Sequence, residues 1–374
     1  MINFRQYPNC TKIVIPSDIS LSTTNFSGAF AEMQDLQYLD IDKNIENKIN
    51  VIGDYKSENG ICYNCKKLIK TAICGPNVTN MDYAYTYCNN LITAVCGPNV
   101  TNMSSAYEYC DNLTTAVCGP NVTRMSYTYS SCTNLTTAVC GDNVTSMHGA
   151  YDYCDNLTTA VCGPNVTDMI SAYADCTNLT TAVCGPNVTN MSSAFSSCTN
   201  LTTEVCGDKV TNMSSAYDGC TNLTTAVCGD KVTNMSSAYR GCTNIQGDTY
   251  FYSSNISSIG DCFYNRNTSN MLNIYVQENS TTMNTCLINN ADSITGSAIT
   301  WTNDSTNKRY YNTQANIYIY PVANVYKAEE TTMLQDFTYD DNNDGTYTLT
   351  GWKETYQGKP STEMIIPDSP KVIL

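Results

Sequence analysis

Apolar residues recur along the middle of this chain with a period of 22 residues. In one copy they stand at Cys110, Leu113, Ala116, Cys118, Val122 and Met125. The same register begins at Cys88, Cys110, Cys132, Cys154, Cys176, Cys198 and Cys220. A unit this short cannot bury its own apolar face, so it has to stack on its neighbours. The pattern therefore predicts a solenoid. It argues against an enzyme, because near-identical coils offer a long surface rather than a unique pocket.

Each coil is expected to contain a short strand, a turn and a second inward-facing segment. The letters LTTAVC at 113–118 predict a strand whose Leu, Ala and Cys point inward. The GPN sequence at 119–121, replaced by GD at 141–142, is a turn signal. Val122 and Met125 then form the second inward segment. The Ser- and Tyr-rich stretch that follows predicts one helical turn leading into the next coil.

The pattern changes at both ends, which predicts four segments. Residues 1–60 form an N-terminal arm with degenerate capping coils, as expected at the end of a repeat array. Residues 61–245 form the regular solenoid, and residues 246–300 form irregular coils. In residues 301–374 the runs NIYIYPVANVY and GTYTLTGW indicate a small β-rich C-terminal domain.

The letters VTNMSSAY, followed by a small residue and Cys-x-Asn-Leu as in GCTNL at 219–223, resemble the BspA-like leucine-rich repeats of bacterial surface proteins. The resemblance is strong over 60–245 and weak over 10–300. This chain has Tyr where that family usually has Phe, and Cys118-type residues where the family has Ile. The resemblance implies a β-rich solenoid of leucine-rich-repeat type, with short strands and single helical turns. It also implies an adhesion or recognition role without catalytic residues.

Composition excludes several classes of partner. The net charge is −15, with 19 Lys and Arg and no basic run, so nucleic acids and anionic membranes are not expected partners. No apolar stretch is long enough to span a bilayer, so membrane insertion is not expected. The first residues lack the pattern of a signal peptide. The resemblance implies a surface-exposed protein, either of a virion or of a bacterial cell, and the missing signal favours a virion, whose proteins need no secretion signal.

Most of the 21 cysteines fall in two repeat columns. One column is Cys74, Cys96, Cys118, Cys140, Cys162, Cys184, Cys206 and Cys228, and the other is Cys88, Cys110, Cys132, Cys154, Cys176, Cys198, Cys220 and Cys242. Their spacing follows the repeat and differs from that of zinc sites. Buried free thiols are the simplest interpretation. Disulfides and a metal site stay open as alternatives.

The Asn before each Leu forms a third column. Its members are Asn112, Asn134, Asn156, Asn178, Asn200 and Asn222. Because buried polar groups need hydrogen-bond partners, we expect a buried amide ladder that satisfies backbone groups of the turns.

Catalytic, metal and cofactor chemistry have little support. His148 is the only histidine, so Ser-His-Asp and Cys-His arrangements have no second candidate base. Residues 340–345 contain the first half of a calcium loop, but position twelve would be Gly351, and a hairpin turn is the simpler interpretation. Cys62 and Cys65 form a lone CxxC without a partner pair. We predict no catalytic residue, no metal and no cofactor.

Tyrosines are the most informative candidate binding residues. The predicted set is Tyr85, Tyr87, Tyr107, Tyr109, Tyr129 and Tyr153. Residues of the Tyr107 type stay Tyr or Phe in every copy, which indicates partial burial, whereas the Tyr109 type alternates with Ser, Asp and Gly, which indicates exposure. An aromatic stripe of this kind suits a glycan or a protein. The alternative is ordinary stacking of tyrosines between coils.

The sequence supports three functional hypotheses. The first is a non-enzymatic recognition or adhesion protein that presents its solenoid to a host-cell, glycan or protein partner, with a phage tail fibre or receptor-binding protein as one setting. The second is a structural spacer, attached to other particle subunits through the N-terminal arm or the C-terminal domain. The third is an ice-binding solenoid, since Thr115 and Val117 are expected to face outward and to form a flat Thr/Val array with their copies.

Overall fold

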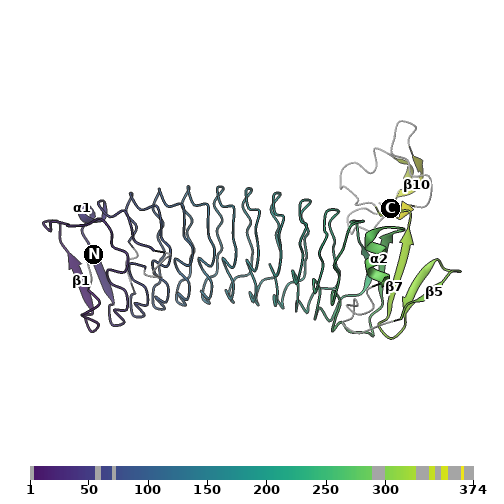
Figure 1. Cartoon of the computed structure of the whole chain (residues 1–374), viewed down its shortest axis with the longest axis horizontal. Helices are drawn as coiled ribbons and strands as arrows, with labels where there is room; N and C mark the ends of the chain where they lie inside the picture. Colours follow the sequence, from purple (N-terminus) through teal and green to yellow (C-terminus); the bar gives the residue numbers. More distant parts are fainter. Residues whose placement is uncertain are drawn as a thin grey trace.

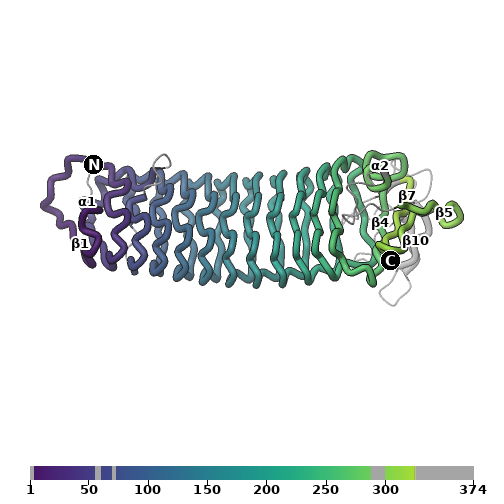
Figure 2. The backbone as a smooth tube through the Cα atoms, turned by 60° about the horizontal axis from the view of Figure 1, so that its bottom comes forward, coloured from purple at the N-terminus to yellow at the C-terminus, as the bar shows by residue number. Residues whose placement is uncertain are grey.

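The computed structural model describes residues 4–54, 60–69, 73–288, 300–325, 337–341, 347–352 and 364–365. Stacked coils form an elongated body, with the N-terminal residues at one end and the last strands at the other (Figure 1). Seen from another side, successive coils lie next to one another along the long axis (Figure 2). This arrangement agrees with the solenoid that the 22-residue period predicts.

The first side of each coil is a parallel ladder at the VTNM segment. Bridges join Asn80 to Asn102, Asn102 to Arg124, and so on at steps of one repeat to Asn234 and Ser258. Here Val and Met are buried, and the two residues between them are exposed or half-buried. The longest continuous series of bridges in the regular coils therefore forms at the second inward-facing segment, and not at the LTTAVC segment where we expected the strand.

The LTTAVC segment forms only isolated bridges, such as Thr115 with Thr137. Two successive threonines, Thr114 and Thr115, are exposed, and Val117 is half-buried. Leu113 and Ala116 on either side of these threonines are buried, so the inward spacing is the same as in the VTNM segment, and the two segments differ in the continuity of their bridges. The expected strand is thus largely absent, and the ice-binding hypothesis loses its predicted Thr/Val array.

The third side of each coil is a chain of turns and not the single helical turn that we expected. The N–H of Tyr107 donates to the carbonyl of Thr128 in the next coil at 2.9 Å, and the N–H of Tyr109 donates to the carbonyl of Ser130 at 2.9 Å. Two residues per coil adopt the left-handed conformation, with φ of 51° at Ser105 and 59° at Tyr109. The left-handed residues redirect the N–H groups along the stack, where a helix would have kept them within the coil.

A short cap precedes the regular coils. Strand β1 (Lys12–Ile15) pairs in parallel with β2 (Tyr38–Ile41), and helix α1 (Lys43–Glu46) follows. The side chain of Asp42 accepts a hydrogen bond from the N–H of Asn44 at 2.8 Å, which caps the helix.

The other end of the solenoid passes directly into a five-stranded sheet. Its elements are β3 (Gly247–Tyr250), β4 (Leu272–Gln277), β5 (Thr302–Asp304), β6 (Arg309–Asn312) and β7 (Ile317–Val322), in the order β3-β4-β7-β6-β5. Strands β3, β4 and β7 are parallel and continue the stacking of coils. Helix α2 (Thr281–Ile288) follows β4. The boundary expected between residues 300 and 301 falls within this sheet, because β3 and β4 precede it and β5, β6 and β7 follow it.

The last strands form two small pairs. Strand β8 (Asn324–Val325) pairs in parallel with β11 (Met364–Ile365), and β9 (Phe337–Asp341) pairs antiparallel with β10 (Tyr347–Trp352). The antiparallel pair agrees with the hairpin interpretation of residues 340–345, whose turn, 342–346, lies outside the described residues.

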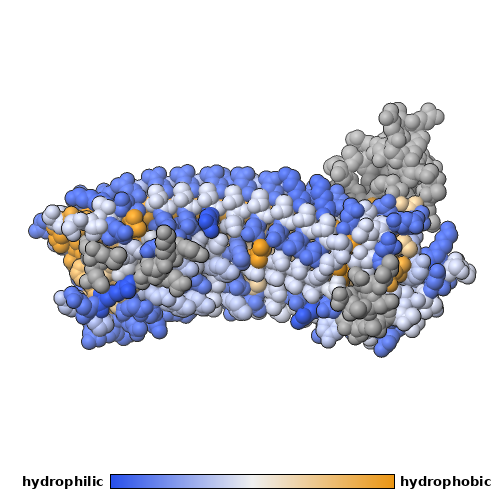
Figure 3. Space-filling model, in the orientation of Figure 1, coloured by the Kyte–Doolittle hydropathy of each residue, from blue (hydrophilic) through white to orange (hydrophobic). Residues whose placement is uncertain are grey.

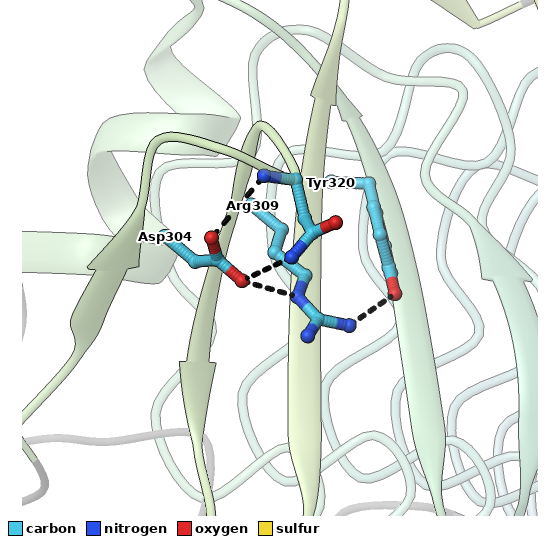
Figure 4. A network of polar contacts seen from close by, with 4 residues as sticks. Asp304, Arg309 and Tyr320 are labelled. Carbon is cyan, nitrogen blue, oxygen red and sulfur yellow. Dashed lines mark hydrogen bonds and ion pairs between the residues drawn. The ribbon is translucent and has the colours of Figure 1, made fainter.

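Two arginines hold strands β5, β6 and β7 in place. The guanidinium of Arg266 is buried and donates to the carbonyl of Ile245 at 3.4 Å in the last coil and to that of Ala315 at 2.6 Å before β7. Arg309 pairs with Asp304 at 3.2 Å and donates to the hydroxyl of Tyr320 at 3.3 Å, which ties β5 and β6 to β7 (Figure 4).

Candidate binding surface

The six tyrosines predicted as binding residues separate into two groups. Tyr85, Tyr107 and Tyr129 have no exposed surface, so they cannot touch a partner and the prediction was wrong for them. Tyr87 is half-buried, Tyr109 is 36% exposed and Tyr153 is 51% exposed. Only these last three stay candidates for recognition.

The buried tyrosines form a ladder that runs through the core. Neighbouring rings lie nearly parallel, as for Tyr107 and Tyr129, whose centroids are 5.7 Å apart with an interplanar angle of 4°. The hydroxyl of Tyr107 accepts from the N–H of Val95 at 2.9 Å and donates to its carbonyl at 2.6 Å. Each hydroxyl of this kind satisfies backbone groups of the LTTAVC side, which lacks a continuous ladder of its own. Coil-to-coil stacking is therefore the role of this column.

The exposed tyrosines lie one residue before cysteines of the column that runs from Cys88 to Cys242, which we call the inner cysteines. Tyr87, Tyr109 and Tyr153 all adopt the left-handed conformation, with φ between 56° and 62°. Tyr87 and Tyr109 stack with ring centroids 4.6 Å apart and an interplanar angle of 8°. The next place in this column is Ser131, followed by Tyr153. The column thus presents aromatic faces at the surface, with one rung missing.

Tyr127 belongs to the same region, although our sequence analysis did not include it in the binding set. It is 37% exposed and lies in the other left-handed column. Its hydroxyl is 2.9 Å from Nε2 of His148. Its ring covers Gly149, where an added Cβ would lie 2.4 Å from ring carbons. The 22-residue register aligns Tyr127 with Tyr83, and counting it strictly would have assigned Tyr127 to this column.

Carboxylates flank these tyrosines. Glu108, Asp152 and Asp175 occupy the two positions before the inner cysteines. Burial raises the pKa of Asp152 to about 7, and the negative charge of Asp175 adds to this rise. Burial also raises the pKa of Glu108. The carboxylates of Asp175 and Asp152 in turn raise the pKa of the Tyr153 hydroxyl.

We call this region the acidic tyrosine surface. It comprises Tyr87, Tyr109, Tyr127, Tyr153, Glu108, Asp152 and Asp175. Over residues 73–207 the sequence has nine Asp or Glu and a single basic residue, Arg124. On the face that Figure 3 shows, the solenoid is mostly hydrophilic, and hydrophobic colour gathers towards the two ends. The acidic tyrosine surface of the middle coils thus combines aromatic rings with an excess of negative charge.

A shallow groove of about 540 Å³ lies on another side of the coils. It is lined by Asn77, Thr79, Asn99, Thr101, Asn121, Thr123 and Asn143. The amide of Asn99 donates to the carbonyl of Pro76 at 2.8 Å, and the hydroxyl of Thr101 donates to that of Thr79 at 3.2 Å. These groups bind neighbouring coils together, so their hydrogen bonds are already used within the stack.

The amide ladder of the turns is this Asn99 column and not the Asn112 column that we predicted. Asn112 is exposed, and its amide donates to the side chain of Asn90 at 3.4 Å. The prediction was wrong because the side chain after Cys and before Leu points to solvent, whereas the Asn of the GPN turn reaches the carbonyl of the preceding turn.

The inner cysteines act as hydrogen-bond donors inside the core. The thiol of Cys132 donates to the carbonyl of Tyr107 at 3.1 Å, and the same bond recurs from coil to coil. Burial raises the pKa of this thiol well above its ordinary value. The cysteines of the other column, from Cys74 to Cys228, are the outer cysteines and face a column of glycines. The N–H of Gly97 donates to Sγ of Cys74 at 3.1 Å. Raised pKa values keep such thiols protonated and poorly nucleophilic at neutral pH.

The described cysteines carry no disulfide in the structure. Cys62 and Cys65 of the CxxC motif are both buried, and Cys65 donates to the carbonyl of Phe30 at 3.1 Å. Within the described ranges, His, Cys, Asp and Glu form no group that could hold a metal ion. No helix in the same ranges is long and apolar enough to cross a membrane.

Comparison with known proteins places this geometry among bacterial repeat proteins. The family model "BspA type Leucine rich repeat region" matches six copies, over residues 2–136, 56–180, 105–217, 170–295 and 213–317. No curated protein matches the sequence. A leucine-rich repeat protein from Bacteroides ovatus has a similar fold, with a TM-score of 0.52 and 16% identity over 71% of this chain and 76% of that one. A leucine rich cell surface protein from Faecalibacterium prausnitzii gives a TM-score of 0.41 and 18% identity, over 74% of this chain and 90% of that one.

Proposed function

Because the chain belongs to the BspA-type leucine-rich repeat family, we propose that it is a non-enzymatic recognition or adhesion protein that presents its solenoid to a partner on a host surface. The match to this repeat family supports such a role. The partner is a surface protein or a glycan, and the protein is displayed on a bacterial cell or a virion.

The exposed tyrosine column carries this proposal. A bulky residue in the left-handed conformation costs of the order of 1–3 kcal/mol, and Tyr87, Tyr109 and Tyr153 all adopt it. Later coils place Gly219 and Gly241 in the same column, where glycine avoids the strain. The left-handed backbone also occurs at serine, aspartate and glycine in this column, so it belongs to the fold, and what distinguishes these coils is a large exposed ring at a place that smaller residues also fill. The fold itself does not need the rings, since serine also occupies this column.

A capture experiment tests the role of these rings. The full chain, immobilised, should retain components of a host-surface fraction, and the double variant Tyr109→Ser with Tyr153→Ser should lose most of this capture. Serine is a suitable replacement because Ser131 and Ser197 adopt the same conformation in the same column. Tyr38→Ser is the matched control, since Tyr38 is 45% exposed but lies in the N-terminal cap. Equal capture by the double variant and the parent would refute the role of the tyrosines.

A spacer function is the second candidate, favoured by the regularity of the stack in Figure 2. Two deletions of equal length separate it from recognition. Removing residues 88–131 takes away two coils with exposed tyrosines, and removing residues 176–219 takes away two coils without them. A spacer should respond to both deletions alike, through a shorter length. A recognition protein should lose capture only with the first.

A further inference from the structure

We propose that the acidic tyrosine surface is a docking site for a basic segment of a partner protein, with an arginine side chain as its central contact. This inference rests on the recognition function proposed above and names the chemistry of the partner. It is carried by the arrangement of rings and carboxylates over neighbouring coils.

The aromatic column leaves room for a flat cation. Tyr87 and Tyr109 stack at 4.6 Å, but Ser131 stands where the next ring would be, before Tyr153. Two coil spacings amount to about 9–10 Å. A planar group in contact with a ring on each side needs about 7–8 Å. A guanidinium therefore fits in the place of the missing rung, against the electron-rich faces of Tyr109 and Tyr153.

The carboxylates beside this gap lack a compensating positive charge. Arg124 is the one Lys or Arg between residues 73 and 207, and its charge acts on Asp82, whereas no cation contributes to the pKa shifts of Glu108 and Asp152. Within the described part of the chain, Oδ1 of Asp152 is buried and has no hydrogen-bond partner. Burial of Asp152 and Glu108 disfavours their charged forms, as their raised pKa values show. A cation from a partner would offset this cost, because a charge that leaves water is tolerated when it is paired.

Charge complementarity selects among the possible partners. A neutral glycan could stack on the tyrosines but would leave the carboxylates uncompensated, and an anionic glycan or phosphate would be repelled by them. Arginine suits the site better than lysine, because its planar guanidinium stacks on aromatic rings and also binds carboxylates through two hydrogen bonds. The favoured occupant is thus a protein segment with exposed arginine.

Peptide binding to the full chain tests the proposal. The probe is a labelled peptide of alternating Arg and Gly, and its counterpart has citrulline in place of arginine, which keeps the shape and removes the charge. Fluorescence anisotropy should show binding of the arginine peptide only, and added salt should weaken it. The pair Asp152→Asn with Asp175→Asn should weaken binding about tenfold. The pair Asp142→Asn with Asp230→Asn removes the same charge from exposed turns and should leave binding within about twofold.

Each alternative outcome overturns either the inference or the recognition function on which it rests. Equal binding of the arginine and citrulline peptides would show that the surface does not recognise the positive charge. Equal weakening of peptide binding by the two Asn pairs would show that only the net charge of the chain matters. The double variant Tyr109→Ser with Tyr153→Ser must also weaken binding of the arginine peptide. If the arginine peptide does not bind while the capture experiment still depends on the tyrosines, the recognition function stands and the basic partner is wrong. If the arginine peptide binds but capture never depends on the tyrosines, the recognition function is the one that fails.

Discussion

The tyrosine ladder contains its own natural control, because one rung lacks a hydroxyl. In most regular coils a buried tyrosine hydroxyl binds the backbone of the LTTAVC side, as Tyr151 does with Val139. At Phe195 the ring stays in the stack, with its centroid 5.8 Å from that of Tyr173, but no hydroxyl reaches Val183. Two opposite substitutions follow, Tyr151→Phe and Phe195→Tyr. Tyr151→Phe removes a pair of hydrogen bonds, and Phe195→Tyr adds such a pair.

The structure sets the size of both effects. The hydroxyl of Tyr151 accepts from the N–H of Val139 at 2.9 Å and donates to its carbonyl at 2.5 Å. A net contribution of about 0.5–1.5 kcal/mol for each bond gives a loss of about 1–3 kcal/mol in Tyr151→Phe. Phe195→Tyr should gain a similar amount, because the added oxygen enters a position that hydroxyls occupy in the neighbouring coils.

Native-state hydrogen exchange measures these changes at the amides concerned. A loss of about 2 kcal/mol corresponds to a roughly thirtyfold fall in protection, and it should appear at the N–H of Val139 in Tyr151→Phe. The N–H of Val183 should become more protected in Phe195→Tyr. Local measurement is preferable to a global unfolding curve, because long repeat arrays need not unfold in one step.

The reasoning would be refuted by unchanged protection of Val183 in Phe195→Tyr together with unchanged protection of Val139 in Tyr151→Phe. That result would mean that stacking of the rings alone holds the column. Tyr109→Phe is the control, because it removes a hydroxyl from an exposed ring and should leave both amides unaffected.

Three further predictions concern the outer thiols, the C-terminal attachment and the buried carboxylate. In Gly141→Ala the new Cβ would lie 2.9 Å from Sγ of Cys118, so thermal denaturation should show a loss of about 1–3 kcal/mol, which Cys118→Ala should largely restore. Arg266→Met leaves several carbonyls without their donor, and it should cost about 3 kcal/mol and expose the chain before β7 to limited proteolysis, whereas a purely local role would leave the cleavage pattern unchanged. The pKa of Asp152 is raised from 3.8 to about 7, so the folded chain holds a proton that the unfolded chain releases, and stability should fall as the pH rises through this interval. Urea midpoints measured across that interval should depend less on pH in Asp152→Asn, and an unchanged slope would contradict the assignment.

Much of the core could be predicted from the sequence. Leu113, Val122 and Met125 were placed inside, and they are buried without exception along the described regular coils. Hydropathy suffices for them, because an aliphatic side chain at a fixed place in a stacked coil is stable only inside. Asparagine and tyrosine have both polar and apolar character, so hydropathy did not predict whether their side chains lie inside the coil or in solvent.

The candidate site was predicted only in part for this reason. The variation of the Tyr109 column with Ser, Asp and Gly correctly indicated exposure, and the constancy of the Tyr107 column indicated burial. Tyr127 was missed, although the 22-residue register aligns it with Tyr83. The flanking carboxylates were also missed, because Glu108, Asp152 and Asp175 come from three different coils and meet only when those coils stack.

By itself, the sequence determined the period, the family and the aliphatic interior. The tertiary structure alone decided which side of the coil carries the continuous ladder, which tyrosines face water and where the carboxylates gather. The physical reason is the direction of the backbone hydrogen bonds. Left-handed residues such as Ser105 and Tyr109 turn their N–H groups towards the next coil, and this bonding between coils, which no local pattern encodes, fixes the direction of every side chain in the turn.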